Sequence, residues 1–332
     1  MKLATYRDGS RDGQLVLVSR DLDRATLVTD MAHTLQDALD RWDDLEPLLR
    51  QRWRQLEAGK IAGAFPFQPR MCMAPLPRAY QWVDGSAYLN HVALVRRARG
   101  AAMPPELLHD PLMYQGGSDS MVGACDDIAC GNEEWGIDFE AEVAVITGDV
   151  PAGISAQEAL AAVKLVMVVN DVSLRNLIPS ELAKGFGFLQ SKPSSSFSPV
   201  AVTPDELGVA WDGGRLHMQM ATFRNAAQVG RLDCGDGMHF SFGQLIAHLC
   251  RTRPAGAGTI VGGGTVSNES AANGYGCIAE QRTRETLEGG APKTPYLRHG
   301  ETVRIEVRDK DGRNVFGTID QKVVAMPIRA CS

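Results

Sequence analysis

Two glutamates, Glu140 and Glu142, lie two residues apart in the segment DFEAEVAVI of this 332-residue chain. Polar and apolar residues alternate there, which predicts a half-buried β-strand. Side chains two apart on a strand point to the same face, so the two carboxylates would lie side by side. Like charges at that separation repel unless a cation or a proton lies between them. The pair therefore indicates a divalent-cation site, with a solvent-facing pair on an edge strand as the alternative.

A third carboxylate, Asp171, follows the apolar run of residues 165–169, which predicts a fully buried strand. The end of a buried strand is a usual place for ligands, although Asp171 could equally cap a following helix. Together with Glu140 and Glu142, this residue supplies three hard oxygen ligands. Such a set suits Mg²⁺ or Ca²⁺ rather than zinc or copper.

The segment that begins at Asp84 predicts a helix to about Arg99, with Asp84 as a possible N-cap residue. His91 lies seven residues further on, about two helical turns, so both side chains would share one helix face. A single histidine on a helix is more often structural. We therefore expect a chemical role for His91 only if it lies beside the acidic residues.

The elements that must position these residues fall into two parts. Residues 15–18 predict a strand, and helical spacing begins at Thr34 and continues in pieces toward Leu56, with an end near Gly59. A proline-rich connector over residues 66–77 follows, so we expect a small N-terminal domain at 1–75 and a catalytic domain at 76–332. A capping box from Ser155 to Glu158 predicts a short helix. Residues 242–250 predict another helix, and further strands are expected at 199–203, 216–223, 259–261, 302–308 and 314–321.

Composition narrows the class of protein. The chain is 44% hydrophobic, enough for a real core, and its 34 glycines with only 6% aromatic residues favour a β-rich body with many turns. A net charge of −6 without a basic block argues against nucleic acid or a membrane as partner. No apolar stretch approaches the roughly 20 residues of a membrane span, and no signal core opens the sequence, so we expect a cytoplasmic protein. The seven cysteines are odd in number and include no CxxC pair, which predicts free thiols and argues against a zinc–cysteine site.

Eight segments in a fixed order resemble the fumarylacetoacetate hydrolase family, from about residue 84 to residue 321. Each segment is weak alone, but their order and approximate spacing agree throughout, whereas the first 75 residues match much less clearly. The segments are DGSAYLNH ending at His91, PLMYQG around Tyr114, DFEAEVAV around Glu140, VVNDVSLRN around Asp171, LQSKP around Lys192, GGGTVSNES from Gly262, GYGCIAE ending at Glu280, and VFGTIDQ near the end.

The resemblance implies an α+β, β-rich fold with a mixed β-sandwich or β-roll core of the fumarylacetoacetase C-terminal type and a small N-terminal domain. It also implies a cytoplasmic homodimer, a small-molecule substrate and a place in aromatic amino acid catabolism. The implied cofactor is a divalent cation, Mg²⁺ or Ca²⁺, with Mn²⁺ also possible. By resemblance, the metal ligands are Asp84, Glu140, Glu142 and Asp171, the general base is His91 with Glu280 as its orienting carboxylate, the basic pocket residues are Arg175 and Lys192, and the residues that touch substrate are Tyr114 and Thr265.

These roles are chemically consistent with hydrolysis of a carbon–carbon bond in a 1,3-diketo acid. A divalent cation chelated by both oxygens of the dicarbonyl would stabilise the enolate leaving group. A neutral His91 would take a proton from water while Glu280 fixes its tautomer. Lys192 stands among Phe186, Phe188 and Leu189, an apolar setting that a free ammonium would avoid, which favours a functional lysine over a surface one.

One segment departs from the family pattern. Fumarylacetoacetate-cleaving members have glutamine and tyrosine where this chain has Ile178 and Leu182. The departure weakens fumarylacetoacetate itself as the substrate and favours a related acylpyruvate. Two alternatives remain: a lyase or isomerase of the same family, such as a decarboxylase of a 2-oxo diacid, and an inactive relative that binds a small acid. The oriented base formed by His91 and Glu280 favours the hydrolase over both.

Overall fold

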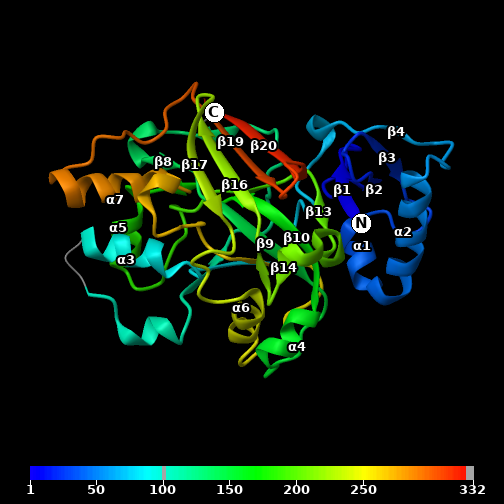
Figure 1. Cartoon of the computed structure of the whole chain (residues 1–332), viewed down its shortest axis with the longest axis horizontal. Helices are drawn as coiled ribbons and strands as arrows, with labels where there is room; N and C mark the ends of the chain where they lie inside the picture. Colours follow the sequence, from blue (N-terminus) through cyan, green and yellow to red (C-terminus); the bar gives the residue numbers. More distant parts are fainter. Residues whose placement is uncertain (99–101, 327–332) are drawn as a thin grey trace, which may run out of the picture.

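The computed structural model describes residues 1–98 and 102–326. The fold is α+β and strand-rich, as expected, with a small N-terminal part built against a larger body (Figure 1). In Figure 1 the N-terminal strands and helices α1 and α2 lie at one end, while α3, α5 and α7 lie at the other. The helices are α1 (Leu35–Asp40), α2 (Trp42–Glu57), α3 (Leu89–Ala98), α4 (Ala156–Ala161), α5 (Ile178–Leu182), α6 (Phe242–Leu249) and α7 (Ile278–Gly289).

One large sheet runs through both parts of the chain in the strand order β4-β3-β2-β1-β13-β10-β9-β18-β5-β6, and β12 pairs beside it with β10. Strand β1 pairs antiparallel with β13, so the sheet is continuous across residue 75. Its strands are β1 (Lys2–Tyr6), β2 (Gln14–Val18), β3 (Arg24–Leu27), β4 (Phe65–Pro66), β5 (Gln81–Gly85), β6 (Met113–Gly116), β9 (Ala141–Thr147), β10 (Val163–Asn170), β12 (Ser196–Phe197), β13 (Ala201–Val202) and β18 (Thr259–Gly262).

A second, five-stranded sheet has the order β17-β16-β19-β20-β7, and two short strand pairs complete the described fold. The five strands are β7 (Ile128–Cys130), β16 (Gln219–Arg224), β17 (Ala227–Asp233), β19 (Thr302–Arg308) and β20 (Asn314–Ala325). The short pairs are β8 (Ile137–Asp138) with β11 (Ser173–Leu174) and β14 (Trp211–Asp212) with β15 (Arg215–Leu216).

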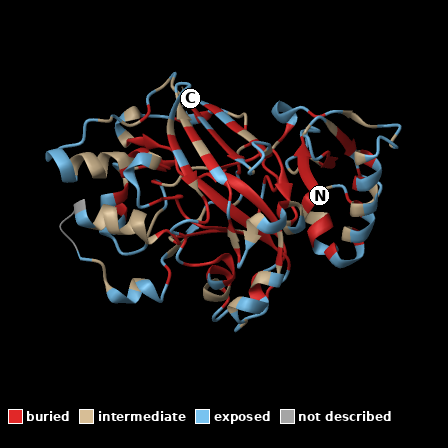
Figure 2. Ribbon diagram, viewed as in Figure 1, coloured by how far each residue is buried: buried red, intermediate tan, exposed pale blue. Residues whose placement is uncertain are grey.

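Strands β9 and β10 are buried on both faces, as the red central strands of Figure 2 show. Val143 and Val145 face a core shared with the second sheet, whereas Ala144 and Ile146 face a core shared with α1 and α2. The prediction of a half-buried strand around Glu142 was therefore wrong. The reason is that the N-terminal helices cover the face that the alternation suggested was open to solvent.

Several other predicted elements differ from the structure in informative ways. Asp84 is not a helix N-cap but the fourth residue of β5, which pairs in parallel with β18 so that Asp84 lies opposite Gly262. The helix begins only at Leu89, and the expected end near Arg99 lies outside the described residues. Asp84 and His91 thus do not share a helix face. The strand expected at 216–223 is interrupted between β15 and β16, and the last strand continues to Ala325.

The remaining predictions of local structure agree with the fold. The capping box of Ser155 and Glu158 begins α4, and residues 242–249 form α6. The six cysteines within the described residues are free thiols, while Cys331 lies outside them. Among the described helices, none combines the length and the hydropathy needed to cross a bilayer.

A matched pair of substitutions tests how the core is packed. Phe197 is fully buried and packs edge-to-face against Trp82, with ring centroids 5.7 Å apart, whereas Phe186 is 99% exposed. Phe197→Ala should lower the free energy of unfolding by roughly 3–5 kcal/mol, since it leaves a cavity. Phe186→Ala should change it by less than about 0.5 kcal/mol. Urea denaturation of both variants measures the difference, and equal effects would contradict the packing described.

Candidate active site and metal centre

Three buried carboxylates converge where neighbouring strands of the large sheet end. Asp84 comes from β5, Glu142 from β9, and Asp171 directly follows β10. One oxygen from each lies within 4.8 Å of the others, and all three residues are buried. The sheet order brings them together, because β18 joins β5 to β9 and β9 pairs with β10. We refer to these three residues as the acidic triad.

The acidic triad fits a hard divalent cation on the chemistry of its donors. Both carboxylate oxygens of Glu142 are buried without a hydrogen-bond partner. Burial, together with the neighbouring carboxylates, raises the pKa of Asp84 to about 8 and raises the pKa of Glu142 well above its usual range. A cation among these oxygens would supply the missing partner and remove the repulsion. Three carboxylates at this spacing are ligands that Mg²⁺, Ca²⁺ or Mn²⁺ accepts.

Two glycines position the carboxylate of Asp84 in the acidic triad. A Cβ atom at Gly262 would lie 2.3 Å from Oδ1 of Asp84, so any larger residue would displace that carboxylate. Gly264 has φ +81° and donates its backbone N–H to Oδ1 of Asp84 at 3.0 Å. The sequence signal was the run GGGT from Gly262, which carries the resemblance but gave no structural reason for its glycines.

Glu140, the fourth predicted ligand, is held differently. Its carboxylate accepts hydrogen bonds from Nη2 of Arg175 and Nζ of Lys192, each at 2.5 Å. Burial alone would raise the pKa of Glu140, but these two cations lower it below its usual range. Glu140 thus lies outside the acidic triad, although it lines the same cavity as Glu142.

Lys192 bridges Glu140 and Asp171, a member of the acidic triad. Its ammonium donates to Oε2 of Glu140 and to Oδ2 of Asp171, both at 2.5 Å, and lies 5.1 Å from the ring centroid of Tyr114. Burial would lower the pKa of Lys192, but the two carboxylates raise it above its usual range, so the side chain is charged.

The prediction that apolar neighbours in the sequence enclose Lys192 was partly wrong. Phe186 and Leu189 are exposed, at 99% and 80%, so they do not enclose the lysine. The side chain of Lys192 is nevertheless only 7% exposed. Its partners in the interior are carboxylates, and the sequence around Lys192 does not show them because they come from distant strands.

Asp138 organises the other side of the pocket. Its Oδ2 accepts a hydrogen bond from Nε of Arg175 at 2.8 Å, and the carboxylate also accepts the backbone N–H groups of Ile278 and Ala279. One buried acid therefore anchors both the guanidinium and the first turn of α7. Asp138 lies in the motif that contains Glu140, but its type and position alone did not distinguish it from a surface residue.

Asp171 is fixed by hydroxyl donors from two further elements. Tyr114 on β6 donates its hydroxyl to Oδ2 at 2.6 Å, and Ser195 donates to Oδ1 at 2.6 Å. Tyr114 lies on the cavity wall and is thereby placed beside the acidic triad. Ser195 was not found from the sequence, where it is one of three consecutive serines without any distinguishing signal.

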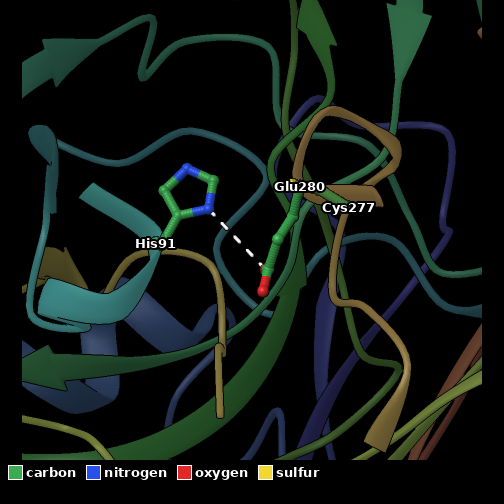
Figure 3. A group of neighbouring side chains, drawn as sticks. All are labelled: His91, Cys277 and Glu280. Carbon is green, nitrogen blue, oxygen red and sulfur yellow. Dashed lines mark ion pairs between the residues drawn. The ribbon is translucent and has the colours of Figure 1, made fainter. Parts of the chain in front are cut away.

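His91 on α3 lines the pocket and faces the buried Glu280 on α7 (Figure 3). Nδ1 of His91 lies 3.8 Å from Oε2 of Glu280, and the glutamate side chain is fully buried. The other carboxylate oxygen, Oε1, accepts hydrogen bonds from Ser267 at 3.0 Å and from Arg284 at 2.6 Å. Glu280 is thus held through one oxygen while the second points at the imidazole. Hydrogen bonds of catalytic groups are often long without substrate and shorten in the complex.

A cavity of about 200 Å³ connects these groups. Cavities of up to about 490 Å³ occur elsewhere in the described chain, but none of the predicted site residues lines them. Ile178 and Leu182, the two departures from the family pattern, also line the 200 Å³ cavity. Of the predicted site residues, the cavity is lined by Asp84, His91, Tyr114, Glu140, Glu142, Arg175, Lys192 and Thr265, with Asp171 and Glu280 buried behind them.

The fold and the site together define a strand-rich protein with a pocket whose carboxylates could hold a divalent cation, beside a histidine–carboxylate pair. Comparison with known families places it more closely. The fumarylacetoacetate (FAA) hydrolase C-terminal model matches residues 81–324, and the fumarylacetoacetase N-terminal domain 2 model matches residues 1–78. The chain belongs to the fumarylacetoacetate hydrolase family.

Individual relatives include hydrolases and an isomerase. A 2,4-didehydro-3-deoxy-L-rhamnonate hydrolase from Sphingomonas sp. (strain SKA58) is 26% identical over 201 residues, which are 60% of this chain and 61% of that protein. A probable 2-hydroxyhepta-2,4-diene-1,7-dioate isomerase from Mycobacterium abscessus has a TM-score of 0.66 at 17% identity, covering 98% of this chain and 99% of the other. Maleylpyruvate hydrolase from Sphingobium sp. SYK-6, solved with manganese(II) and pyruvate, has a TM-score of 0.65 at 14% identity, covering 98% and 100%. At these identities the two solved structures show a shared fold.

The cation site is tested by Glu142→Gln, which removes one charge from the acidic triad without changing its shape. Wild-type protein in Mg²⁺ at about 100 times its Kd should gain about 2.7 kcal/mol of stability, and the variant should lose that gain. Without metal, the variant should melt at or above the wild-type temperature, because a buried glutamine carries no ionisable group for the neighbouring carboxylates to oppose. Glu134→Gln, at an exposed position, serves as the control. A variant that Mg²⁺ still stabilises fully would contradict the assignment.

Proposed function

We propose that this protein is a hydrolase that cleaves the carbon–carbon bond of an acylpyruvate, a 2,4-dioxo acid, to give pyruvate and a carboxylic acid. The observation that carries the proposal is the His91–Glu280 pair, whose histidine opens onto the same cavity as the acidic triad. Water adds to the acyl carbonyl carbon, the bond to the pyruvate methylene breaks, and the methylene carbon takes up a proton. Each atom of the water thus appears in the products.

The relatives support this substrate class. The name 2,4-didehydro-3-deoxy-L-rhamnonate describes a sugar acid with carbonyl groups at its second and fourth carbons. Maleylpyruvate is also an acylpyruvate, and the solved hydrolase that acts on it was crystallised with manganese(II) and pyruvate. A 1,3-dicarbonyl unit next to a carboxylate is common to both compounds, whereas their acyl parts differ.

A divalent cation held by Asp84, Glu142 and Asp171 would polarise the substrate carbonyls as a Lewis acid. His91 would take a proton from water through Nε2, because its Nδ1 faces Glu280. Glu280 would then stabilise the imidazolium that forms, as the carboxylate partner does in other histidine-based hydrolases. Ser267 and Arg284 keep the glutamate aimed at the ring through its second oxygen.

Lys192 and Arg175 remain charged and lie at the cavity wall, where they can attract the carboxylate of the substrate or the oxygen on which negative charge develops. Both are already engaged by carboxylates, so their first effect is to limit the negative charge of the pocket. Thr265 is buried at the same wall and offers a neutral hydroxyl.

The proposed reaction can be tested on purified protein loaded with Mg²⁺ or Mn²⁺. Incubation with acetylpyruvate, longer acylpyruvates, fumarylacetoacetate and oxaloacetate should give loss of the enol absorbance together with stoichiometric pyruvate from the acylpyruvates. In water labelled with heavy oxygen, the label should enter the carboxylic acid product. A chelator should abolish turnover. Release of carbon dioxide from oxaloacetate without cleavage of acylpyruvates would instead favour the decarboxylase alternative.

The base is tested by His91→Ala, which should lower kcat by roughly 10² to 10⁴-fold. The affinity for Mg²⁺ should hardly change, because His91 does not belong to the acidic triad. His33→Ala is the matched control, since the side chain of His33 is 56% exposed on the N-terminal part of the chain. Turnover by His91→Ala at the wild-type rate would remove His91 from the mechanism.

Substrate choice is tested by Ile178→Gln. Ile178 is buried and lines the cavity, so a glutamine there would add an amide donor to an apolar wall. We expect the wild type to prefer acylpyruvates with small or apolar acyl groups, and the variant to shift kcat/KM toward fumarylacetoacetate. One oxyanion donor is typically worth about 10² to 10³ in kcat, which bounds the shift. Unchanged relative kcat/KM values in the variant would show that this wall does not select the substrate.

A further inference from the structure

A second cluster of possible metal ligands lies beside the acidic triad and has a different chemistry. His91, Cys277 and Glu280 each place one donor atom within 4.8 Å of the other two (Figure 3). These atoms are a nitrogen, a sulfur and an oxygen. Sequence spacing did not reveal the cluster, because only the approach of α3 to the start of α7 brings His91 to the other two residues.

Two atoms of this cluster lack partners despite being buried. Nδ1 of His91 and Oε2 of Glu280 each make no hydrogen bond, and they face each other at 3.8 Å. This distance exceeds that of an ordinary hydrogen bond. It is close to the separation of about 3.4 Å between nitrogen and oxygen ligands of a tetrahedral zinc ion, given bond lengths of about 2.1 Å. A single ion bound between the two atoms would therefore fit this separation, and without an ion the pair can still close to a hydrogen bond.

We propose that His91, Cys277 and Glu280 form a second metal site, selective for a thiophilic divalent cation such as Zn²⁺ or Co²⁺. Thiolate and imidazole ligands prefer such ions, whereas the three carboxylates of the acidic triad prefer Mg²⁺ or Mn²⁺. Three protein ligands would leave one position for water. The ion reaches the site past His91, whose side chain is 18% exposed and lines the cavity.

Binding requires the thiol of Cys277 to lose its proton. Burial raises the pKa of Cys277 well above its usual range, and Asp138 adds to this effect. The incoming cation replaces that proton, which passes to the solvent, as in other metal–thiolate sites. The buried carboxylates around Cys277 favour a cation for the same electrostatic reason that they disfavour a bare thiolate.

Occupation of this site would inhibit the enzyme. With Nδ1 of His91 and Oε2 of Glu280 both bound to the ion, the glutamate could no longer stabilise an imidazolium. This consequence rests on the proposed function, whereas binding of the ion does not. Experiments can therefore contradict inhibition by the ion without contradicting its binding.

The binding test uses the full chain with Mg²⁺ in excess, so that the acidic triad is occupied, and Co²⁺ as the probe. Wild-type protein should bind Co²⁺ with the near-ultraviolet absorption of a cobalt–thiolate bond. Cys277→Ser should lose that absorption, and Cys125→Ser, at a half-buried cysteine outside the cluster, should retain it. Circular dichroism establishes that each variant is folded. No thiolate absorption in the wild type, or an equal absorption in Cys277→Ser, would overturn the proposal.

Isothermal titration with Zn²⁺ under the same conditions provides a second readout. His91→Ala should weaken Zn²⁺ binding by more than the roughly 10- to 100-fold that loss of an outer-shell partner costs. This variant decides the question if Cys277→Ser does not fold, and wild-type affinity in it would overturn the site. Zn²⁺ should also stop turnover of the Mg²⁺-loaded enzyme. Zn²⁺ that binds through Cys277 and His91 without slowing turnover would refute the proposed role of His91 while leaving the metal site intact.

Discussion

Burial of mutually repelling carboxylates is the constraint on which the rest of this structure depends. Asp84, Glu142 and Asp171 lie within a few ångström of one another, and both oxygens of Glu142 lack hydrogen-bond partners. Such a cluster destabilises the metal-free protein, since ionised groups are costly to bury without compensation. The surrounding structure must therefore be rigid enough to hold it. Strands β9 and β10, buried on both faces between two hydrophobic cores, provide that rigidity.

Cationic side chains and hydrogen-bond donors of the chain offset only part of the negative charge of these carboxylates. Besides Glu280, five buried acids surround the pocket, namely the acidic triad together with Asp138 and Glu140, and two cations, Arg175 and Lys192, pair with some of these five. Asp138 and Glu140 are held by these cations, and Asp171 is also bound by Tyr114 and Ser195. Asp84 and Glu142 have the fewest such partners, since Asp84 accepts one backbone N–H and Glu142 accepts no hydrogen bond. A bound cation would therefore stabilise chiefly Asp84 on β5 and Glu142 on β9, the strand that pairs with β18.

The sequence predicted what depends on short-range pattern and missed what depends on the meeting of distant segments. Glu142 and Asp171 were found from their types beside apolar runs, and α4 from its capping box. Asp84 was assigned to a helix because its parallel pairing with β18 has no local signal. The roles of Asp138, Ser195 and Gly262 depend on partners far along the chain. His91 and Glu280 could be paired only through the family resemblance, because nothing near either residue indicates the other.

The lining of the cavity includes both charged and apolar side chains, and this division bears on substrate choice. The charged lining residues are Asp84, Glu140, Glu142, Lys192 and Arg175, whereas Ile178, Leu182 and Phe188 are apolar lining residues. A 2,4-dioxo acid has the same division, since its carboxylate and carbonyl oxygens lie at one end and its acyl group at the other. The charged end would be bound in the same way whatever the acyl group. Under the proposed function, discrimination between acylpyruvates is left to the apolar lining residues around Ile178, the segment expected from the sequence to depart from the family pattern.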